Sequence, residues 1–210
     1  KHYYLINILR TKIDFNKINS ILEIGGGSGH FPILFKSYHA NLKQYFSIDL
    51  PQILIFNIIF TMNFFPSAKF CLPNEFEKIQ KDELNNFDFI FLTPNQINTL
   101  GNDIVDLTIN TSSFAEMNKK DIVNYFELAQ RATKNAGYFF NHNRVHKLPE
   151  PHSEIGEKIR HKLEANIFSD YPFRKNNKLL IYDICRLSQF LKIDPMMVRL
   201  EEINKSDEKK

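Results

Sequence analysis

Four of the seven glycines in the chain lie within five residues, at Gly25, Gly26, Gly27 and Gly29. Glycine allows positive φ angles and leaves space for a ligand against the backbone. An acidic residue, Glu23, stands two positions before the first glycine, so the segment has the pattern acidic-x-G-x-G-x-G. Backbone N–H groups at the start of a following helix would favour an anionic group such as a carboxylate. The spacing therefore predicts a loop that binds a small ligand with an anionic end.

Two other glycine-rich loops do not fit this spacing. The dinucleotide fingerprint G-x-G-x-x-G requires a glycine or alanine three positions after Gly27, where this chain has His30. The P-loop requires Gly-Lys followed by Ser or Thr, and no such tripeptide follows the glycines at the required distance. A nicotinamide-dependent oxidoreductase is therefore a disfavoured alternative.

A second acidic signal, Asp49, lies 20 residues after Gly29. A doubly wound α/β fold places at this position a carboxylate that accepts hydrogen bonds from ribose hydroxyls. Pro51 favours the first turn of a helix, so Asp49 can also serve as the N-cap of that helix. The two motifs are independent, and together they predict a ligand that contains a ribose.

Strands and helices alternate around these motifs, which predicts an α/β fold with a Rossmann-like, doubly wound, mostly parallel sheet. The expected strands are Ser20–Ile24 and residues 45–49, 87–92, 105–110, 138–142, 179–184 and 197–202. Residues 69–72 compete with 87–92 for the third strand; we favour 87–92 because a polar loop then follows it. The expected helices are residues 2–10, 31–38, 51–62, 75–84, 121–132 and 154–168, with Gly137 as a C′ glycine after the fifth.

Length and composition fit one domain. The chain has 210 residues, of which 43% are apolar and 20 are phenylalanine, enough for a substantial core. We expect residues 1–205 to form a single domain and residues 206–210 to be a disordered tail. Residues 1–19 are expected to form a helical cover, which can continue upstream because the first residue is Lys1 and not methionine.

Charge and cysteine usage limit the partners. The net charge of +3 comes from 27 basic and 24 acidic residues that are scattered, so no basic block marks a nucleic-acid surface. Cys71 and Cys185 are expected to be buried free thiols, which suits the cytoplasm. The most apolar stretch, residues 53–65, is shorter than the ~20 residues of a membrane span and is expected to be a core helix or a homo-oligomer contact.

Several segments resemble one family. The acidic-x-G-x-G-x-G segment resembles motif I of the class I S-adenosylmethionine-dependent methyltransferases, and Asp49-Leu50-Pro51 resembles the DLP segment of their O-methyltransferase branch. Residues 106–117 (DLTINTSSFAEM) and 138–144 (YFFNHNR) are similar to the bacterial sugar O-methyltransferases of surface-polysaccharide clusters, which carry INT-x-SF-x-EM and N-x-NR segments. The resemblance covers residues 21–144. It implies a seven-stranded class I fold, S-adenosylmethionine as the cofactor, and a sugar hydroxyl of a polysaccharide or nucleotide-sugar precursor as the acceptor.

The resemblance also implies roles for individual residues. It implies cofactor contacts from Glu23, Gly25, Gly26, Gly27, Gly29, Asp49, Leu50, Thr93, Pro94, Asn110, Thr111 and Ser112. It implies substrate contacts from Phe114, Asn143 and Arg144, although Arg144 can equally be a plain surface residue. A cofactor-binding partner protein without catalysis, and a methyltransferase acting on a hydroxyl of a non-sugar small molecule, stay open as alternatives.

Methyl transfer to a hydroxyl requires a group that takes the hydroxyl proton, and this group should follow the fourth or fifth strand. Glu116 and His142 are the candidates, and His146 is less suitable. Glu116 can instead cap the helix that begins near Asn118, and strand alternation can bury His142. Some sugar O-methyltransferases use magnesium, but the chain has no compact carboxylate cluster, so we assign no metal ligand.

Overall fold

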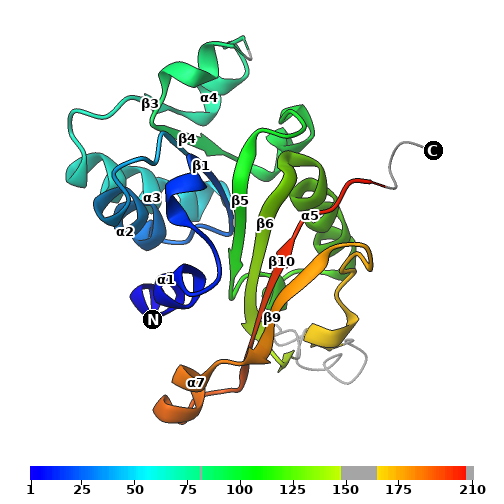
Figure 1. Ribbon diagram of the computed structural model, residues 1–210. Coiled ribbons are helices and arrows are strands. Elements are labelled where there is room, and N and C mark those ends of the chain that lie inside the picture. Colours follow the sequence, from blue (N-terminus) through cyan, green and yellow to red (C-terminus); the bar gives the residue numbers. More distant parts are fainter. Residues whose placement is uncertain (81, 148–164, 207–210) are drawn as a thin grey trace, which may run out of the picture.

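The computed structural model describes residues 1–80, 82–147 and 165–206 (Figure 1). Within these residues one sheet has eight strands in the order β3-β4-β2-β1-β5-β6-β10-β9, and β7 pairs separately with β8. The strands are β1 (Ser20–Ile24), β2 (Gln44–Ile48), β3 (Phe70–Cys71), β4 (Phe89–Leu92), β5 (Val105–Thr111), β6 (Thr133–Arg144), β7 (His146–Lys147), β8 (Asn166–Ile167), β9 (Lys178–Ile184) and β10 (Met196–Glu202). Neighbours from β3 to β6 are parallel, whereas β10 runs antiparallel between β6 and β9.

Helices cover both faces of the large sheet. The described α-helices are α1 (His2–Arg10), α2 (His30–Tyr38), α3 (Pro51–Phe64), α4 (Pro73–Phe76), α5 (Lys119–Ala132) and α7 (Arg186–Leu191). Helices α1, α2 and α3 lie on one side of the sheet and α5 on the other (Figure 1). Two buried apolar clusters fill these layers: one includes Leu5, Phe35 and Leu54 of the first three helices, and the other includes Phe126 and Ala129 of α5.

Strand β1 shows how the sequence produces these layers. All five of its residues are buried. Because side chains alternate along a strand, Ile21 joins the cluster under α1, α2 and α3, whereas Leu22 and Ile24 join the cluster under α5. The parallel strands β1, β2, β4 and β5 end at the same edge of the sheet, so the loops that follow them gather there.

The expected α/β class and the expected C-terminal antiparallel pair, β9 and β10, are confirmed. Residues 87–92 contain β4, which pairs directly with β2, so the favoured third strand is also confirmed. The expected number of seven strands is one too low because Phe70–Cys71 adds a short strand outside β4. Both candidates for the third strand are therefore in the sheet.

Gly137 does not terminate a helix, and this expectation was wrong. Helix α5 ends at Ala132, and Gly137 lies inside β6, which begins much earlier than expected. The pairing of β5 with β6 shifts register between Val105 and Leu107, and Ala136 has a φ of 60°. A Cβ atom at position 137 would lie 2.8 Å from the backbone oxygen of Asp106, so this irregular part of the β5–β6 pairing requires glycine.

Other expectations about helices also change. In α1 the inward stripe is Leu5, Ile6 and Leu9, whereas Tyr3 is exposed. The expected helix over residues 75–84 is replaced by the short α4 and a 3₁₀ turn, Glu83–Asn86. The expected helix over residues 154–168 lies mostly outside the described residues, and its described end forms β8 and a 3₁₀ turn. Helix α3 is not a core helix, because it buries only Leu54, Asn57 and Thr61.

The two cysteines, Cys71 and Cys185, are free and buried, as expected. Of the helices in the described ranges, none has both the length and the apolar character needed to cross a membrane.

Candidate active site

A cavity of about 850 Å³ opens at the edge of the sheet where β1, β2 and β4 end. We call it the glycine-loop cavity. It is lined from these strand ends by Gly25, Asp49, Leu50, Pro94 and Asn95, and from the segment around α5 by Ser113, Glu116, Asp121, Asn124 and Tyr125, among others. It is the place where a doubly wound sheet binds its ligand, because loops diverge on either side of the central strand.

The glycine loop has three positive φ angles, 75° at Gly25, 55° at Gly27 and 83° at Gly29. Three of its glycines are packed tightly against the protein. A Cβ atom would lie 2.3 Å from Ser113 Oγ at Gly25, 2.2 Å from Ser47 Oγ at Gly26, and 2.6 Å from Asn57 Oδ1 at Gly29.

Gly27 differs, because a Cβ atom there would meet nothing within 4 Å. The loop is therefore anchored at Gly25, Gly26 and Gly29 and open at Gly27. The backbone is accessible at Gly27, whereas Gly25 is the glycine of this loop that lines the glycine-loop cavity.

Asp49 holds the loop and faces the cavity. Its Oδ2 accepts a hydrogen bond from the Gly27 N–H at 2.7 Å, and its Oδ1 accepts one from the Leu50 N–H at 2.7 Å. Burial raises the pKa of this carboxyl, and the two backbone donors oppose that rise. The N-cap of α3 is Leu50, so the alternative role of Asp49 as that N-cap is not observed. A carboxylate oxygen has more than one lone pair, and Asp49 can therefore accept further donors from a ligand.

Glu23 lies beneath the loop and does not line the cavity. Its carboxyl is 2% exposed and accepts a hydrogen bond from the Tyr45 hydroxyl at 2.9 Å. Burial raises the pKa of Glu23 well above its usual value. A Cβ atom at Gly26 would lie 3.3 Å from Glu23 Oε2. The acidic residue of the motif thus supports the loop from the side opposite the cavity.

The polar loop after β4 is fixed by its own residues. Thr93 N–H and Thr93 Oγ1 both donate to Gln96 Oε1, at 2.9 and 3.1 Å. This contact turns the chain so that Pro94 and Asn95 line the glycine-loop cavity. Thr93 itself does not line it.

Asn110 and Asn143 are fully buried, and neither lines a cavity. Asn110 Nδ2 donates to the carbonyl of Ile24 at 2.9 Å, and Asn143 Nδ2 donates to Asn110 Oδ1 at 2.7 Å and to Asn141 Oδ1 at 2.7 Å. These amides join the ends of β1, β5 and β6. They position the edge of the sheet, whereas the neighbouring Ser113 reaches the cavity surface.

Phe114 is also placed in the core. Its ring is 0% exposed and packs against Tyr125, Phe126 and Tyr171. The resemblance implied a substrate contact for this ring, but the structure gives it no access to either cavity. Thr111 is half-buried and lines neither cavity.

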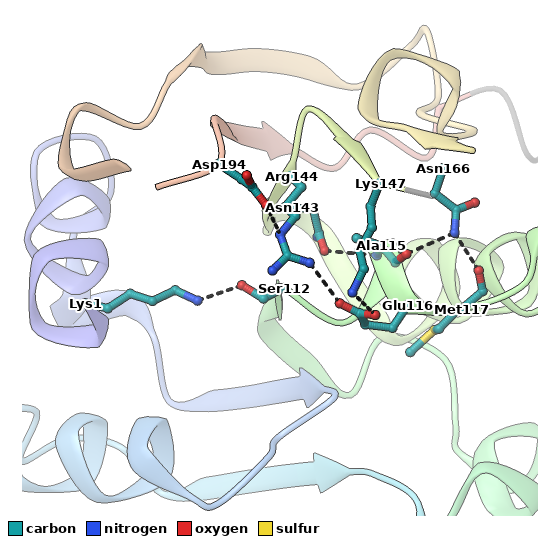
Figure 2. Close-up of polar contacts among 10 residues, drawn as sticks. All are labelled: Lys1, Ser112, Ala115, Glu116, Met117, Asn143, Arg144, Lys147, Asn166 and Asp194. Carbon is teal, nitrogen blue, oxygen red and sulfur yellow. Dashed lines mark hydrogen bonds and ion pairs between the residues drawn. The ribbon is translucent and has the colours of Figure 1, made fainter. Parts of the chain in front are cut away.

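A second cavity, of about 520 Å³, lies beside the first and is named the His142 cavity. Its lining comes from the ends of β5 and β6, the start of β10, helix α7 and the N-terminal residue: Lys1, Ser112, Glu116, His142, Arg144, Cys185, Leu187, Ser188, Leu191, Ile193, Asp194 and Met196. Ser112, with a φ of 65°, accepts a hydrogen bond from Lys1 Nζ at 2.6 Å (Figure 2). Ser112 therefore faces this cavity and not the glycine loop.

His142 is 1% exposed, and its Nδ1 has no hydrogen-bond partner among the described residues. Burial lowers its pKa to about 3, and the positive charge of Lys1 lowers it further in the same direction. The imidazole is therefore neutral at physiological pH. A buried polar atom without a partner is costly, so a ligand group that donates to Nδ1 would remove that cost.

Glu116 lines both cavities and marks where they meet. Its Oε1 lies 3.3 Å from Arg144 Nη1, its Oε2 pairs with Lys147 Nζ, and Arg144 Nε lies 3.3 Å from Asp194 Oδ2 (Figure 2). The alternative role of Glu116 as a helix cap is not observed, because the Asn118 side chain caps α5. His146 is exposed on β7 and lines neither cavity.

The sequence analysis missed several lining residues. They are Ser113, Asn95, Asn98, Asp121, Asn124 and Tyr125 of the glycine-loop cavity, and Lys1, Ser188 and Asp194 of the His142 cavity. Ser113 and Asn95 directly follow Ser112 and Pro94, which were predicted to contact the cofactor, so extending each predicted segment by one residue would have included them. No sequence signal indicated Lys1, Ser188 or Asp194, because they come from segments far from the motifs. No group of three or more His, Cys, Asp or Glu side chains in the described part of the chain is arranged to hold a metal ion.

Comparison with known proteins identifies the fold. No protein-family model matches the sequence, and no curated protein matches it. Solved structures do match the whole architecture. A candidate sarcosine dimethylglycine methyltransferase from Galdieria sulphuraria has a TM-score of 0.64 at 12% identity, covering 97% of this chain and 85% of that one.

Two further solved structures are the S-adenosylmethionine-dependent methyltransferase SibL and the mitomycin 7-O-methyltransferase MmcR. SibL has a TM-score of 0.55 at 10% identity, with 95% of this chain covered, and MmcR has 0.57 at 11%, with 92% covered. The chain spans 54% of SibL and 52% of MmcR, about half the length of each. At these identities the likeness concerns the fold: the chain has the fold of the class I S-adenosylmethionine-dependent methyltransferases.

Proposed function

We propose that the chain transfers a methyl group from S-adenosylmethionine to a hydroxyl group of an acceptor. The observation that carries this proposal is the pair of adjoining cavities that meet at Glu116. One is lined by Gly25 of the glycine loop and by the carboxylate of Asp49, and the other contains a buried neutral imidazole whose Nδ1 has no hydrogen-bond partner among the described residues. Two-substrate group transfer requires such adjacent sites.

The glycine-loop cavity fits the cofactor. Asp49 offers a carboxylate to the ribose hydroxyls, and Gly25 brings the glycine loop to the cavity surface, where the amino-acid end would lie. Leu50 and Pro94 supply apolar surface on the side where an adenine would lie. The solved structures that share this fold include S-adenosylmethionine-dependent enzymes, which supports the same cofactor here. When bound, it supplies a methyl group activated by a sulfonium.

The chain itself must orient the acceptor hydroxyl and take its proton. His142 is the candidate we favour, since its imidazole is unprotonated at physiological pH and its Nδ1 has no hydrogen-bond partner among the described residues. Both oxygens of Glu116 are engaged by cations, Arg144 and Lys147. We therefore assign Glu116 to positioning at the junction of the cavities and His142 to proton removal.

The acceptor is proposed to be a sugar. The His142 cavity combines polar groups, such as Arg144 and Ser188, with an apolar wall that includes Leu187, Leu191 and Met196. Hydroxyl groups and the C–H face of a sugar ring would meet these two kinds of surface. Both segments that resemble sugar O-methyltransferases contribute to the lining of this cavity, with Ser112 and Glu116 from the first and His142 and Arg144 from the second, which supports the same assignment. The apolar wall also suits a hydroxylated acceptor with an apolar body, and this is the second candidate.

Calorimetry and a transfer assay test the proposal. We expect S-adenosylhomocysteine to bind and NAD not to bind. Radiolabelled S-adenosylmethionine is then offered with simple sugars, nucleotide sugars, polysaccharide fragments and phenols, and we expect label in the sugar hydroxyls. His142→Asn should lower the transfer rate by about 10²- to 10⁴-fold with cofactor affinity retained. Glu116→Gln should retain more activity than His142→Asn.

Three results would contradict parts of this proposal. Binding of S-adenosylhomocysteine without transfer to any hydroxyl would indicate a non-catalytic binding protein. Label in phenols alone would exclude the sugar assignment. Loss of activity in Glu116→Gln with activity retained in His142→Asn would exchange the two roles.

A further inference from the structure

Helix α3 exposes most of its large apolar residues and buries two polar ones, Asn57 and Thr61. None of its 14 residues is charged. Its exposed large apolar residues, each between 40% and 60% exposed, are Ile53, Ile55, Phe56, Ile59, Phe60, Met62 and Phe64. The side facing the protein consists of Leu54, Asn57 and Thr61. A surface helix of a monomeric protein normally has the opposite arrangement, and contiguous exposed apolar surface marks a contact site.

The orientation of α3 is fixed by its polar side. Asn57 Nδ2 donates to Ser47 Oγ at 2.9 Å, and Thr61 Oγ1 donates to Asn57 Oδ1 at 3.2 Å. Gly29 packs directly on Asn57, since a Cβ atom there would lie 2.6 Å from Asn57 Oδ1. The amide of Asn57 therefore supports the glycine loop, and turning the helix to bury its phenylalanines would remove that support. The outward apolar face is thus built into the fold.

Neither cavity of the candidate active site accounts for this face. Leu50, which precedes α3, lines the glycine-loop cavity, but the residues of α3 itself line neither cavity. Two other exposed apolar residues, Leu191 and Ile193, differ in this respect, because they line the His142 cavity. None of the described residues covers the outer face of α3, which points to a contact with another molecule.

The lack of charged residues on α3 indicates what kind of molecule covers this face. A helix that lies in a membrane surface carries Lys or Arg on its polar face, and α3 has neither, with its polar side turned into the protein. A protein partner with an ordinary mixture of charges would leave some of them buried without partners. A second copy of α3 brings a face that is equally free of charge.

The exposed apolar area of α3 is also large enough for a stable protein–protein interface. Seven side chains of about 200 Å² each, exposed by about half, offer roughly 700 Å², close to the ~800 Å² per partner of a stable interface. A two-fold axis brings the same patch of both copies together. We propose that the chain is a homodimer joined through the outer face of α3. This proposal does not depend on the chemistry of the active site.

Sedimentation equilibrium of the protein, with Phe56→Glu and Ile59→Lys as separate variants, tests the dimer. Both residues are exposed in one copy, so these changes should leave the fold intact, which circular dichroism checks. We expect twice the monomer mass for the unchanged protein and the monomer mass for both variants at the same concentration. Val123→Glu is the matched control: Val123 is 47% exposed on α5, on the other face of the sheet, and this variant should remain a dimer.

Several results would overturn the proposal. A monomeric unchanged protein overturns it, and co-sedimentation of that monomer with neutral or anionic lipid vesicles would indicate that lipid covers α3. A dimer that persists in both α3 variants shows that another surface joins the copies. If one variant fails to fold, the other decides, because the two substitutions differ in charge and position.

Discussion

Replacing Asp49 tests the cofactor site most directly, because the measurement requires no knowledge of the acceptor. Asp49→Ala removes the carboxylate that faces the glycine-loop cavity. It also removes the acceptor for the Gly27 and Leu50 N–H groups. Both donors lie beside the cavity opening, where water can replace the lost acceptor. We therefore expect the fold to persist.

The expected effect on binding follows from the hydrogen bonds that a ribose would make. A hydrogen bond to a charged group contributes about 1.5 to 3 kcal/mol. A loss of about 1 to 3 kcal/mol raises the dissociation constant of S-adenosylhomocysteine roughly 5- to 150-fold. Titration calorimetry at neutral pH measures this change, and the melting temperature without ligand reports on the fold.

The pH dependence of S-adenosylhomocysteine binding is a second test of the role of Asp49. Burial raises the pKa of this carboxyl, so it takes up a proton at a higher pH than an exposed aspartate does. A protonated carboxyl is a weaker acceptor for ribose hydroxyls. Affinity for S-adenosylhomocysteine should therefore fall as the pH is lowered through that raised pKa. Asp49→Asn should lack this part of the pH dependence.

Asp121→Asn is the matched control. Asp121 lines the same cavity from α5 and carries the same charge. If general electrostatics of the cavity determined affinity, both aspartates would matter equally. We expect the affinity of Asp121→Asn to stay within about twofold of the unchanged protein. An unchanged dissociation constant in Asp49→Ala, or an equal loss in Asp121→Asn, would refute the assignment of Asp49 to the ribose.

Two further predictions concern the glycine loop and His142. Gly27→Val should abolish S-adenosylhomocysteine binding, because a β-branched side chain is strained at a φ of 55° and distorts the loop that Asp49 holds, and normal binding by this variant would show that the loop does not serve the cofactor. Gly26→Ala should lower the melting temperature, because its Cβ would collide with Ser47 Oγ. His142 has a pKa of about 3 in the folded protein, compared with 6.5 for an unperturbed histidine. Between these two pH values the unfolded chain binds a proton that the folded chain does not bind. The free energy of unfolding therefore falls as the pH is lowered from 6.5 to about 3. At pH 5 this loss is about 2 kcal/mol relative to neutral pH, and urea denaturation at both pH values should show it reduced in His142→Asn. The same low pKa predicts a pH–rate profile without an imidazole inflection between pH 5 and 8, and an inflection near 6.5 would show that His142 is not buried during turnover.

The sequence was sufficient for most of the strands and for the backbone conformation of the glycine loop. A strand buried on both faces is a short apolar run, and β1 and β4 are such runs, so burial could be inferred without knowing the neighbouring strands. The glycine spacing and Asp49 are likewise local patterns, since positive φ at Gly25 and Gly29 depends on residues close in the chain. Gly137 shows what a local sequence pattern cannot predict. Its requirement comes from the backbone of Asp106 on another strand.

Residue roles at the edge of the sheet could not be inferred in this way. Asn110, Ser113 and Glu116 belong to one predicted segment, yet the first joins strands, the second faces the glycine-loop cavity and the third lies between the two cavities. Whether a polar side chain there contacts a ligand depends on which distant group satisfies it. For Glu116 these groups are Arg144 and Lys147, which no spacing rule connects to it.

The sequence by itself determined the α/β class, most of the strands of the large sheet and the position of the loop at Gly25 to Gly29, because periodicity and backbone conformation are properties of neighbouring residues. Tertiary structure alone decided which side of α3 faces outward. The apolar pattern of α3 predicted burial, but the amide of Asn57 is required under Gly29, and only one side of a helix can face the protein. Tertiary structure also made His142 neutral, because burial and the charge of Lys1, which is remote in the chain, set its pKa.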